Sequence, residues 1–132
     1  MSYLLDTHTL IWAITEPQKL SSIAKKVLIN TDNEVSVSAV SFWEISLKYS
    51  IGKLMLEGYG PEDFPQAALA TGFKIIPLTA ETTSSYHQLK AAYHRDPFDK
   101  MLIWQAIQLN LTLISCDENV HKYESEGLKV IW

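Results

Sequence analysis

Apolar residues occur along this chain in short runs that alternate with stretches of helical spacing. The short runs end at polar or turn-forming residues, as expected for buried strands. We predict strands at residues 3–5, 35–38, 74–78, 111–114 and 129–131. Apolar positions three and four residues apart predict helices after the turn at 6–8 and at about 20–29, 39–51, 62–70, 80–92, 96–110 and 118–123. This alternation favours an α/β fold with a central parallel sheet of about five short strands, covered by helices on both faces.

No repeat, low-complexity tract or linker interrupts the chain, so we expect a single domain over residues 1–132. With 47% hydrophobic and 20% charged residues, the composition is that of an ordinary globular protein. No apolar run approaches the roughly 18 residues that span a membrane. The first residues lack the basic region of a signal peptide. The single cysteine, Cys116, excludes an internal disulfide framework and a cysteine zinc site. We therefore expect a cytoplasmic protein with no membrane association.

The formal net charge of −4 argues against a passive nucleic-acid binder with a basic surface. It does not exclude an enzyme that acts on nucleic acid with acidic residues gathered around metal ions. The positions of the acidic residues therefore decide more than their number.

The segment from His94 to Ala106 carries the first candidate acid. Asp96 followed by Pro97 predicts a helix start, with Asp96 as N-cap. Asp99 then falls in the first turn and begins the apolar stripe of the helix, which should face the core. An ionised carboxylate in that position is costly unless it is paired. The alternative is that Asp96 and Asp99 only complement the helix dipole.

Four acids are predicted near the carboxyl ends of the strands, where open α/β sheets bind their ligands. They are Asp6, Glu44, Asp99 and Asp117. Each also has a simpler structural role open to it, since Asp6 and Asp117 are plausible N-caps and Ser41 to Glu44 has the spacing of a capping box. Two carboxylates about 5 Å apart repel by roughly 3 kcal/mol at an effective dielectric near 20, so four together require a cation. Oxygen ligands without cysteine point to Mg²⁺ or Mn²⁺ and to metal-assisted phosphodiester hydrolysis.

Four stretches of the chain resemble the motifs of PIN domains, and the match is closest to the VapC-like toxin nucleases of bacterial toxin–antitoxin pairs. The motifs occur in the family's order and cover essentially the whole chain. They are Leu5-Asp6-Thr7-His8, Val37-Ser38-Ala39-Val40-Ser41-Phe42-Trp43-Glu44-Ile45, His94-Arg95-Asp96-Pro97-Phe98-Asp99-Lys100-Met101-Leu102-Ile103 and Leu113-Ile114-Ser115-Cys116-Asp117.

The resemblance implies a PIN-like three-layer α/β/α fold and an endoribonuclease that depends on Mg²⁺ or Mn²⁺. It places the family's acidic quartet, which binds the metal and carries the catalysis, on Asp6, Glu44, Asp99 and Asp117. It also implies an RNA substrate, a small antitoxin protein as inhibitor, and a homodimer. Secondary candidates are Thr7 as a small hydroxyl in the site, Asp96 as helix cap or metal ligand, and Arg95 as a phosphate contact.

Two other functions remain open on the sequence. A Mg²⁺-dependent phosphatase of similar fold also places an acid after its first strand, but this chain lacks a second aspartate two residues on. A non-catalytic PIN-like interaction module is disfavoured because all four acids are present.

The histidines and aromatic residues have two interpretations each. His8 and His94 are candidate general bases, although a structural or substrate-contact role is favoured. Trp43 and Tyr49 are either base-stacking or core residues. Trp12 and Trp104 are expected in the core or at a subunit contact, and Trp104 departs from the smaller residue common in the family. An apolar helix surface around Trp12, Ile23 and Trp104 fits the implied homodimer.

Overall fold

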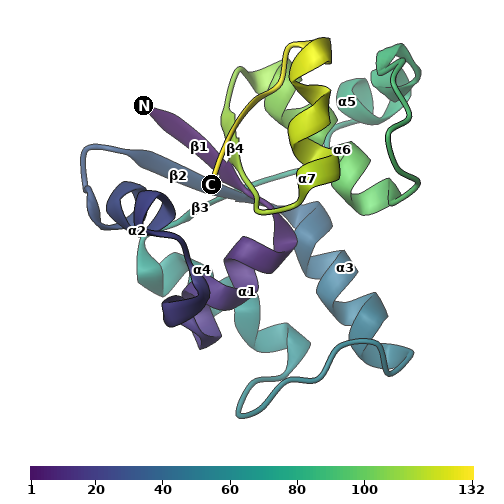
Figure 1. Ribbon diagram of the computed structural model, residues 1–132. Coiled ribbons are helices and arrows are strands. Elements are labelled where there is room, and N and C mark those ends of the chain that lie inside the picture. Colours follow the sequence, from purple (N-terminus) through teal and green to yellow (C-terminus); the bar gives the residue numbers. More distant parts are fainter.

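A five-stranded sheet, parallel throughout, organises the structure, a computed structural model that describes residues 1–132 (Figure 1). The strands are β1 (Ser2–Leu5), β2 (Glu34–Ser38), β3 (Lys74–Ile76), β4 (Thr112–Ile114) and β5 (Lys129–Ile131), in the order β3-β2-β1-β4-β5. The helices are α1 (Thr7–Thr15), α2 (Ser22–Ile29), α3 (Ala39–Ser50), α4 (Phe64–Thr71), α5 (Ala80–Ser85), α6 (Pro97–Leu109) and α7 (Glu118–His121). The predicted strands are thus all present.

Two hydrophobic clusters cover the two faces of the sheet. Successive side chains of a strand point to opposite faces, so Tyr3 and Leu5 of β1 enter one cluster and Leu4 enters the other. Helices α1, α2 and α4 close the first cluster, whereas α6 and α7 close the second, on opposite sides of the sheet in Figure 1. The predicted three-layer α/β/α fold with a parallel sheet is confirmed.

Helix α3 leaves the carboxyl end of β2 and contributes to both clusters, through Val40 in one and Ile45 in the other. Its N-cap is Ser38, whose hydroxyl accepts a hydrogen bond from the Val40 N–H at 3.1 Å. The suggested capping box from Ser41 to Glu44 is therefore wrong. Glu44 lies in the second turn of α3, so helix capping does not account for its position.

The helix predicted over residues 80–92 is wrong in its second half. Helix α5 ends at Ser85, a short 3-10 turn covers Tyr86–Gln88, and residues 89–96 are irregular. The backbone N–H groups of Lys90 and Ala91 donate to the carboxylate of Glu126, at 2.8 and 2.7 Å. Partners from the C-terminal part of the chain thus replace the hydrogen bonds of a continuing helix.

Trp104 is buried, whereas Trp43 and Tyr49 are exposed. Trp104 is buried in the core, and its indole N–H donates to the Thr82 carbonyl and to the Ser85 hydroxyl, both at 3.1 Å. It is therefore not part of an exposed apolar helix surface. Trp43 is 60% exposed and Tyr49 is 47% exposed, so the core interpretation of these two residues is wrong.

No helix of the chain combines the length and the apolar character needed to cross a lipid bilayer.

Candidate metal centre

The carboxyl ends of β1 and β4 lie side by side at the middle of the sheet, with Leu5 paired to Ile114. The chain continues to β2 and β3 on one side of this pair and reaches β5 on the other. Ligands of open parallel sheets bind at such a switch point. Asp6 directly follows β1 and Asp117 lies shortly after β4, so the topology brings these two distant acids to the same edge.

Both of these acids cap helices, which is the simpler role that the sequence allows them. Asp6 accepts a hydrogen bond from the Thr9 N–H at 2.8 Å at the start of α1, and Asp117 accepts one from the Asn119 N–H at 2.8 Å at the start of α7. In each case one oxygen, Oδ1, makes the capping bond. Burial raises the pKa of Asp6, although hydrogen bonds from Ser115 and Thr9 oppose the rise. Capping therefore does not exhaust the ligand capacity of either carboxylate.

Asp99 lies in the first turn of α6, with 16% of its side chain exposed. Burial raises its pKa from 3.8 to about 8, and the charges of Asp96, Asp6, Glu44 and Asp117 add to the rise, in that order. The charges of four other carboxylates thus raise the pKa of Asp99. Three of these carboxylates lie at the starts of helices, and the fourth, that of Glu44, lies in the second turn of α3. Such mutual repulsion in a half-enclosed site favours a bound cation.

Glu44 is the most deeply buried acid of the site, with only 2% exposed. Its Oε2 forms an ion pair with Lys48 one turn further along α3, whereas its Oε1 is buried without a hydrogen-bond partner. Burial lowers the pKa of Lys48, but the bond to Glu44 and the charges of Glu44, Asp96 and Asp99 outweigh burial and raise it overall. Lys48 is thus the internal counter-ion of the site, but it does not provide a hydrogen-bond partner for the buried Oε1 of Glu44.

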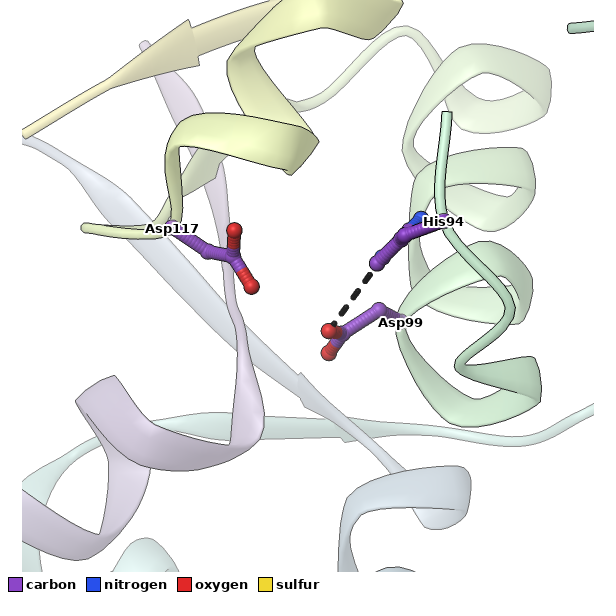
Figure 2. Close-up of side chains that lie close together, drawn as sticks. All are labelled: His94, Asp99 and Asp117. Carbon is purple, nitrogen blue, oxygen red and sulfur yellow. Dashed lines mark ion pairs between the residues drawn. The ribbon is translucent and has the colours of Figure 1, made fainter. Parts of the chain in front are cut away.

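His94, Asp99 and Asp117 come closest to one another (Figure 2). A ring nitrogen of His94 and one oxygen from each carboxylate all lie within 4.8 Å of one another. Figure 2 shows the three side chains converging from the irregular segment 89–96, from α6 and from the start of α7. Asp6 and Glu44 lie outside this group, although their charges act on Asp99. The sequence did not predict that His94 lies close to Asp99 and Asp117. Its position just before α6, which carries Asp99, was the only signal.

The secondary candidates have separate contacts. Thr7 is buried and its hydroxyl donates to the Ser41 hydroxyl at 3.0 Å, which joins α1 to α3. Asp96 caps α6 through Oδ1, which accepts from the Phe98 and Asp99 N–H groups at 2.9 and 3.1 Å. Its Oδ2 lies 3.9 Å from the Lys48 Nζ. Arg95 is exposed and makes no ion pair within the chain.

The residues present fit a divalent cation. The donor set consists of carboxylate oxygens with one imidazole nitrogen, and two of its buried atoms, Glu44 Oε1 and His94 Nε2, lack hydrogen-bond partners. Buried polar atoms without partners are rare in proteins, and a cation next to either atom would supply the contact that it lacks.

A sequence model of the PIN domain family matches residues 3–126, and the chain therefore belongs to this family. It is similar to ribonuclease VapC22 of Mycobacterium tuberculosis (strain ATCC 25618 / H37Rv). The two are 24% identical over 129 residues, which cover 98% of this chain and 97% of the relative.

Several solved structures have a similar fold. VapBC2 from Rickettsia felis, bound to a DNA fragment from its promoter, matches with a TM-score of 0.67 and 20% identity over 99% of this chain and 98% of that chain. FitAcB from Neisseria gonorrhoeae matches with a TM-score of 0.66 and 22% identity over 100% of this chain and 97% of that chain. VapBC-1 from nontypeable Haemophilus influenzae gives a TM-score of 0.67 and 18% identity over 99% and 97% of the respective chains. These likenesses establish the shared fold.

Proposed function

We propose that this chain is a metal-dependent endoribonuclease that hydrolyses RNA phosphodiester bonds, and that it is the toxin of a toxin–antitoxin pair. The observation that carries the proposal is the convergence of carboxylates on Asp99, whose pKa rises to about 8. Membership of the PIN family and similarity to a ribonuclease named VapC22 support the same activity.

Asp6, Glu44, Asp99 and Asp117 would hold Mg²⁺ or Mn²⁺, with Asp99 as the group on which the charges of the other three act. A divalent ion supplies Lewis-acid stabilisation of a phosphodiester under attack and a nucleophilic water at neutral pH. Asp99 can bind as a carboxylate only by giving up its proton, and a cation among the acids drives that ionisation. Lys48 keeps Glu44 oriented and balances part of the negative charge.

Groups around the acids are suited to hold a single-stranded RNA. Trp43 is exposed on α3, with its ring 5.0 Å from the ring of Phe98 in an edge-to-face arrangement that fixes its orientation. An exposed, braced indole is a stacking platform for an unpaired base. Arg95 lies next to the cap of α6 and is free to contact a phosphate.

The antitoxin would cover the exposed apolar side chains that follow Trp43 on α3. Leu47 of α3 is 38% exposed, Ile51 at its C-cap is 57% exposed, and Met55 beyond the helix is 88% exposed. Trp43 and Leu47 are four residues apart and so lie on the same face of α3, and exposed apolar side chains on one helix face indicate a protein partner. The similar solved structures are named as VapBC and FitAB. We also propose the homodimer, for which Ile23 and Ile29 of α2, 52% and 77% exposed, offer an apolar surface on another helix.

Cleavage of a labelled RNA and of total RNA, with Mg²⁺, with Mn²⁺ and with EDTA, tests the activity. We expect cleavage that EDTA abolishes and that Asp117→Asn reduces at least about a hundredfold. Asp32→Asn, an exposed aspartate in the turn before β2, is the matched control and should cleave like the wild type. Turnover of an aryl phosphate without RNA cleavage would favour the phosphatase instead.

Expression in a bacterial host tests the toxin role. The wild type should arrest growth and Asp117→Asn should not, at equal protein levels. Growth arrest by both proteins would show that the arrest does not come from hydrolysis at this site.

A further inference from the structure

His94 lies in the acidic site with one ring nitrogen facing Asp99, within the distance of an ion pair. Its Nε2 lies 3.4 Å from Asp99 Oδ2 and is buried without a hydrogen-bond partner, while 11% of its side chain remains exposed. The other ring nitrogen, Nδ1, lies 3.3 Å from the hydroxyl oxygen of Tyr123. The ring is thus anchored through Nδ1, whereas Nε2 faces the Asp99 carboxylate at ion-pair distance without a hydrogen bond.

The anchor of the ring is part of the core. Tyr123 is fully buried, and its hydroxyl oxygen also accepts a hydrogen bond from the Tyr93 N–H at 3.2 Å. The ring of Tyr93 packs edge-to-face on that of Tyr123 at 5.0 Å. Glu126 holds the backbone of Lys90 and Ala91 at one end of the segment that carries His94, and the capping bonds of Asp96 hold its other end.

The spacing of the three side chains matches a coordination sphere. Ligands on opposite sides of an octahedral ion are separated by about 4.2 Å when each bond is about 2.1 Å. The donor atoms of His94, Asp99 and Asp117 lie within 4.8 Å of one another, so an ion reaches all three after small side-chain movements. Glu44, whose Oε2 is paired with Lys48 but whose Oε1 is buried without a hydrogen-bond partner, also acts on Asp99 through its charge.

We propose that His94 is a metal ligand through Nε2, and that the site it forms with Asp99 and Asp117 selects Mn²⁺ over Mg²⁺. The inference rests on the proposed function, because it concerns the ion that the nuclease uses. Imidazole nitrogen binds first-row transition-metal ions well, whereas Mg²⁺ keeps to oxygen ligands and water. Tyr123 then acts as the partner that orients a metal-binding histidine, because it accepts the Nδ1–H and leaves the lone pair of Nε2 facing the acids.

Metal binding without substrate tests the proposal, with Mn²⁺ and Mg²⁺ as the probes. Titration followed by the electron paramagnetic resonance of free Mn²⁺ gives the Mn²⁺ affinity, and competition with Mg²⁺ gives the selectivity. We expect His94→Gln to weaken Mn²⁺ binding at least about tenfold and Mg²⁺ binding much less, so that the Mn²⁺/Mg²⁺ preference falls. His87→Gln, an exposed histidine after α5, is the matched control and should change neither affinity.

A spectroscopic signature makes the test independent of whether the variant folds. Pulsed electron paramagnetic resonance of Mn²⁺ bound to the wild type should show coupling to a directly bound ¹⁴N nucleus. Tyr123→Phe, which keeps the packed ring but removes the anchor of Nδ1, should lower Mn²⁺ affinity in the same direction as His94→Gln. Absence of the ¹⁴N coupling in the wild type, or an unchanged selectivity in a folded His94→Gln, overturns the proposal.

The result for Asp99→Asn separates this inference from the proposed function. If Asp99→Asn loses Mn²⁺ while His94→Gln binds like the wild type, the acidic metal site stands and only the role of His94 fails. If Asp99→Asn binds Mn²⁺ like the wild type, the metal site of the proposed nuclease fails, and the role of His94 fails with it.

Discussion

Replacing Asp99 by asparagine should stabilise the metal-free protein. At pH 7 the folded chain keeps Asp99 protonated, because its pKa is about 8, whereas the unfolded chain ionises it at the ordinary value of 3.8. Holding that proton costs about 1.4 kcal/mol for each pH unit above 3.8, or about 4 kcal/mol at pH 7. Asparagine has the same shape and no proton to hold. Allowing for relaxation of the neighbouring acids, we expect a gain of about 2–4 kcal/mol.

The sign of the pH dependence follows from the raised pKa. Between pH 3.8 and about 8 the folded state binds one proton more than the unfolded state, so the stability of the wild type falls as pH rises through this window. Asp99→Asn should lack this slope. Above about pH 8 both states are ionised, and the full penalty of the wild type is then present.

Thermal unfolding in EDTA, followed by circular dichroism at pH 5, 7 and 8.5, measures the effect. A gain of about 2–4 kcal/mol corresponds to roughly 6–12 °C in a chain of this size at pH 7, with a smaller difference at pH 5. Excess Mn²⁺ should reverse the order, because only the wild type gains stability from binding. A melting temperature of Asp99→Asn equal to or below that of the wild type in EDTA at pH 7 would refute the account of charge crowding around Asp99.

Substitutions at three further residues test the surroundings of the site. Asp96→Ser keeps an N-cap on α6, whereas Asp96→Ala removes it. In urea unfolding the alanine variant should therefore be about 1 kcal/mol less stable than the serine variant. Equal stabilities of the two variants would contradict the capping role. Lys48→Met leaves Glu44 buried without its counter-ion and should lower the free energy of unfolding of the metal-free protein by about 2–3 kcal/mol at pH 7. The double variant Lys48→Met/Glu44→Gln should recover much of this loss. A Lys48→Met variant as stable as the wild type would argue against the ion pair. Glu126→Gln weakens the acceptor of the backbone N–H groups of Lys90 and Ala91. Amide hydrogen exchange at these two residues should therefore accelerate by about tenfold. Exchange in β1 should stay unchanged and serves as the internal control.

Most of the fold could be predicted from the sequence because its elements are locally encoded. The strands are short apolar runs, and the Asp96-Pro97 start of α6 is a local signal that the structure bears out. Residues 89–96 could not be predicted in this way. Their helical spacing continues past Ser85, but the partners of their backbone N–H groups are side chains about a quarter of the chain away, on Tyr123 and Glu126.

The candidate site was predictable in its composition and less so in its geometry. The position of an acid after a strand is a local feature, which is why Asp6 and Asp117 could be placed at one edge of the sheet. The closeness of His94 to Asp99 and Asp117 depends on how the irregular segment is held, and no local pattern encodes that. The assignment of the four acids as metal ligands stays a prediction, and Mn²⁺ titration of Asp99→Asn tests it for Asp99.

The order of the site residues along the chain has a consequence for folding. Asp6 and Glu44 precede residue 50, whereas Asp99, Asp117 and the residues that anchor His94 follow residue 90. The two groups meet only when β1 and β4 have paired, and contacts between such distant parts of a chain cost more loop-closure entropy than local ones. A partly folded chain without that strand pairing therefore lacks the acidic pocket, even where its helices have already formed.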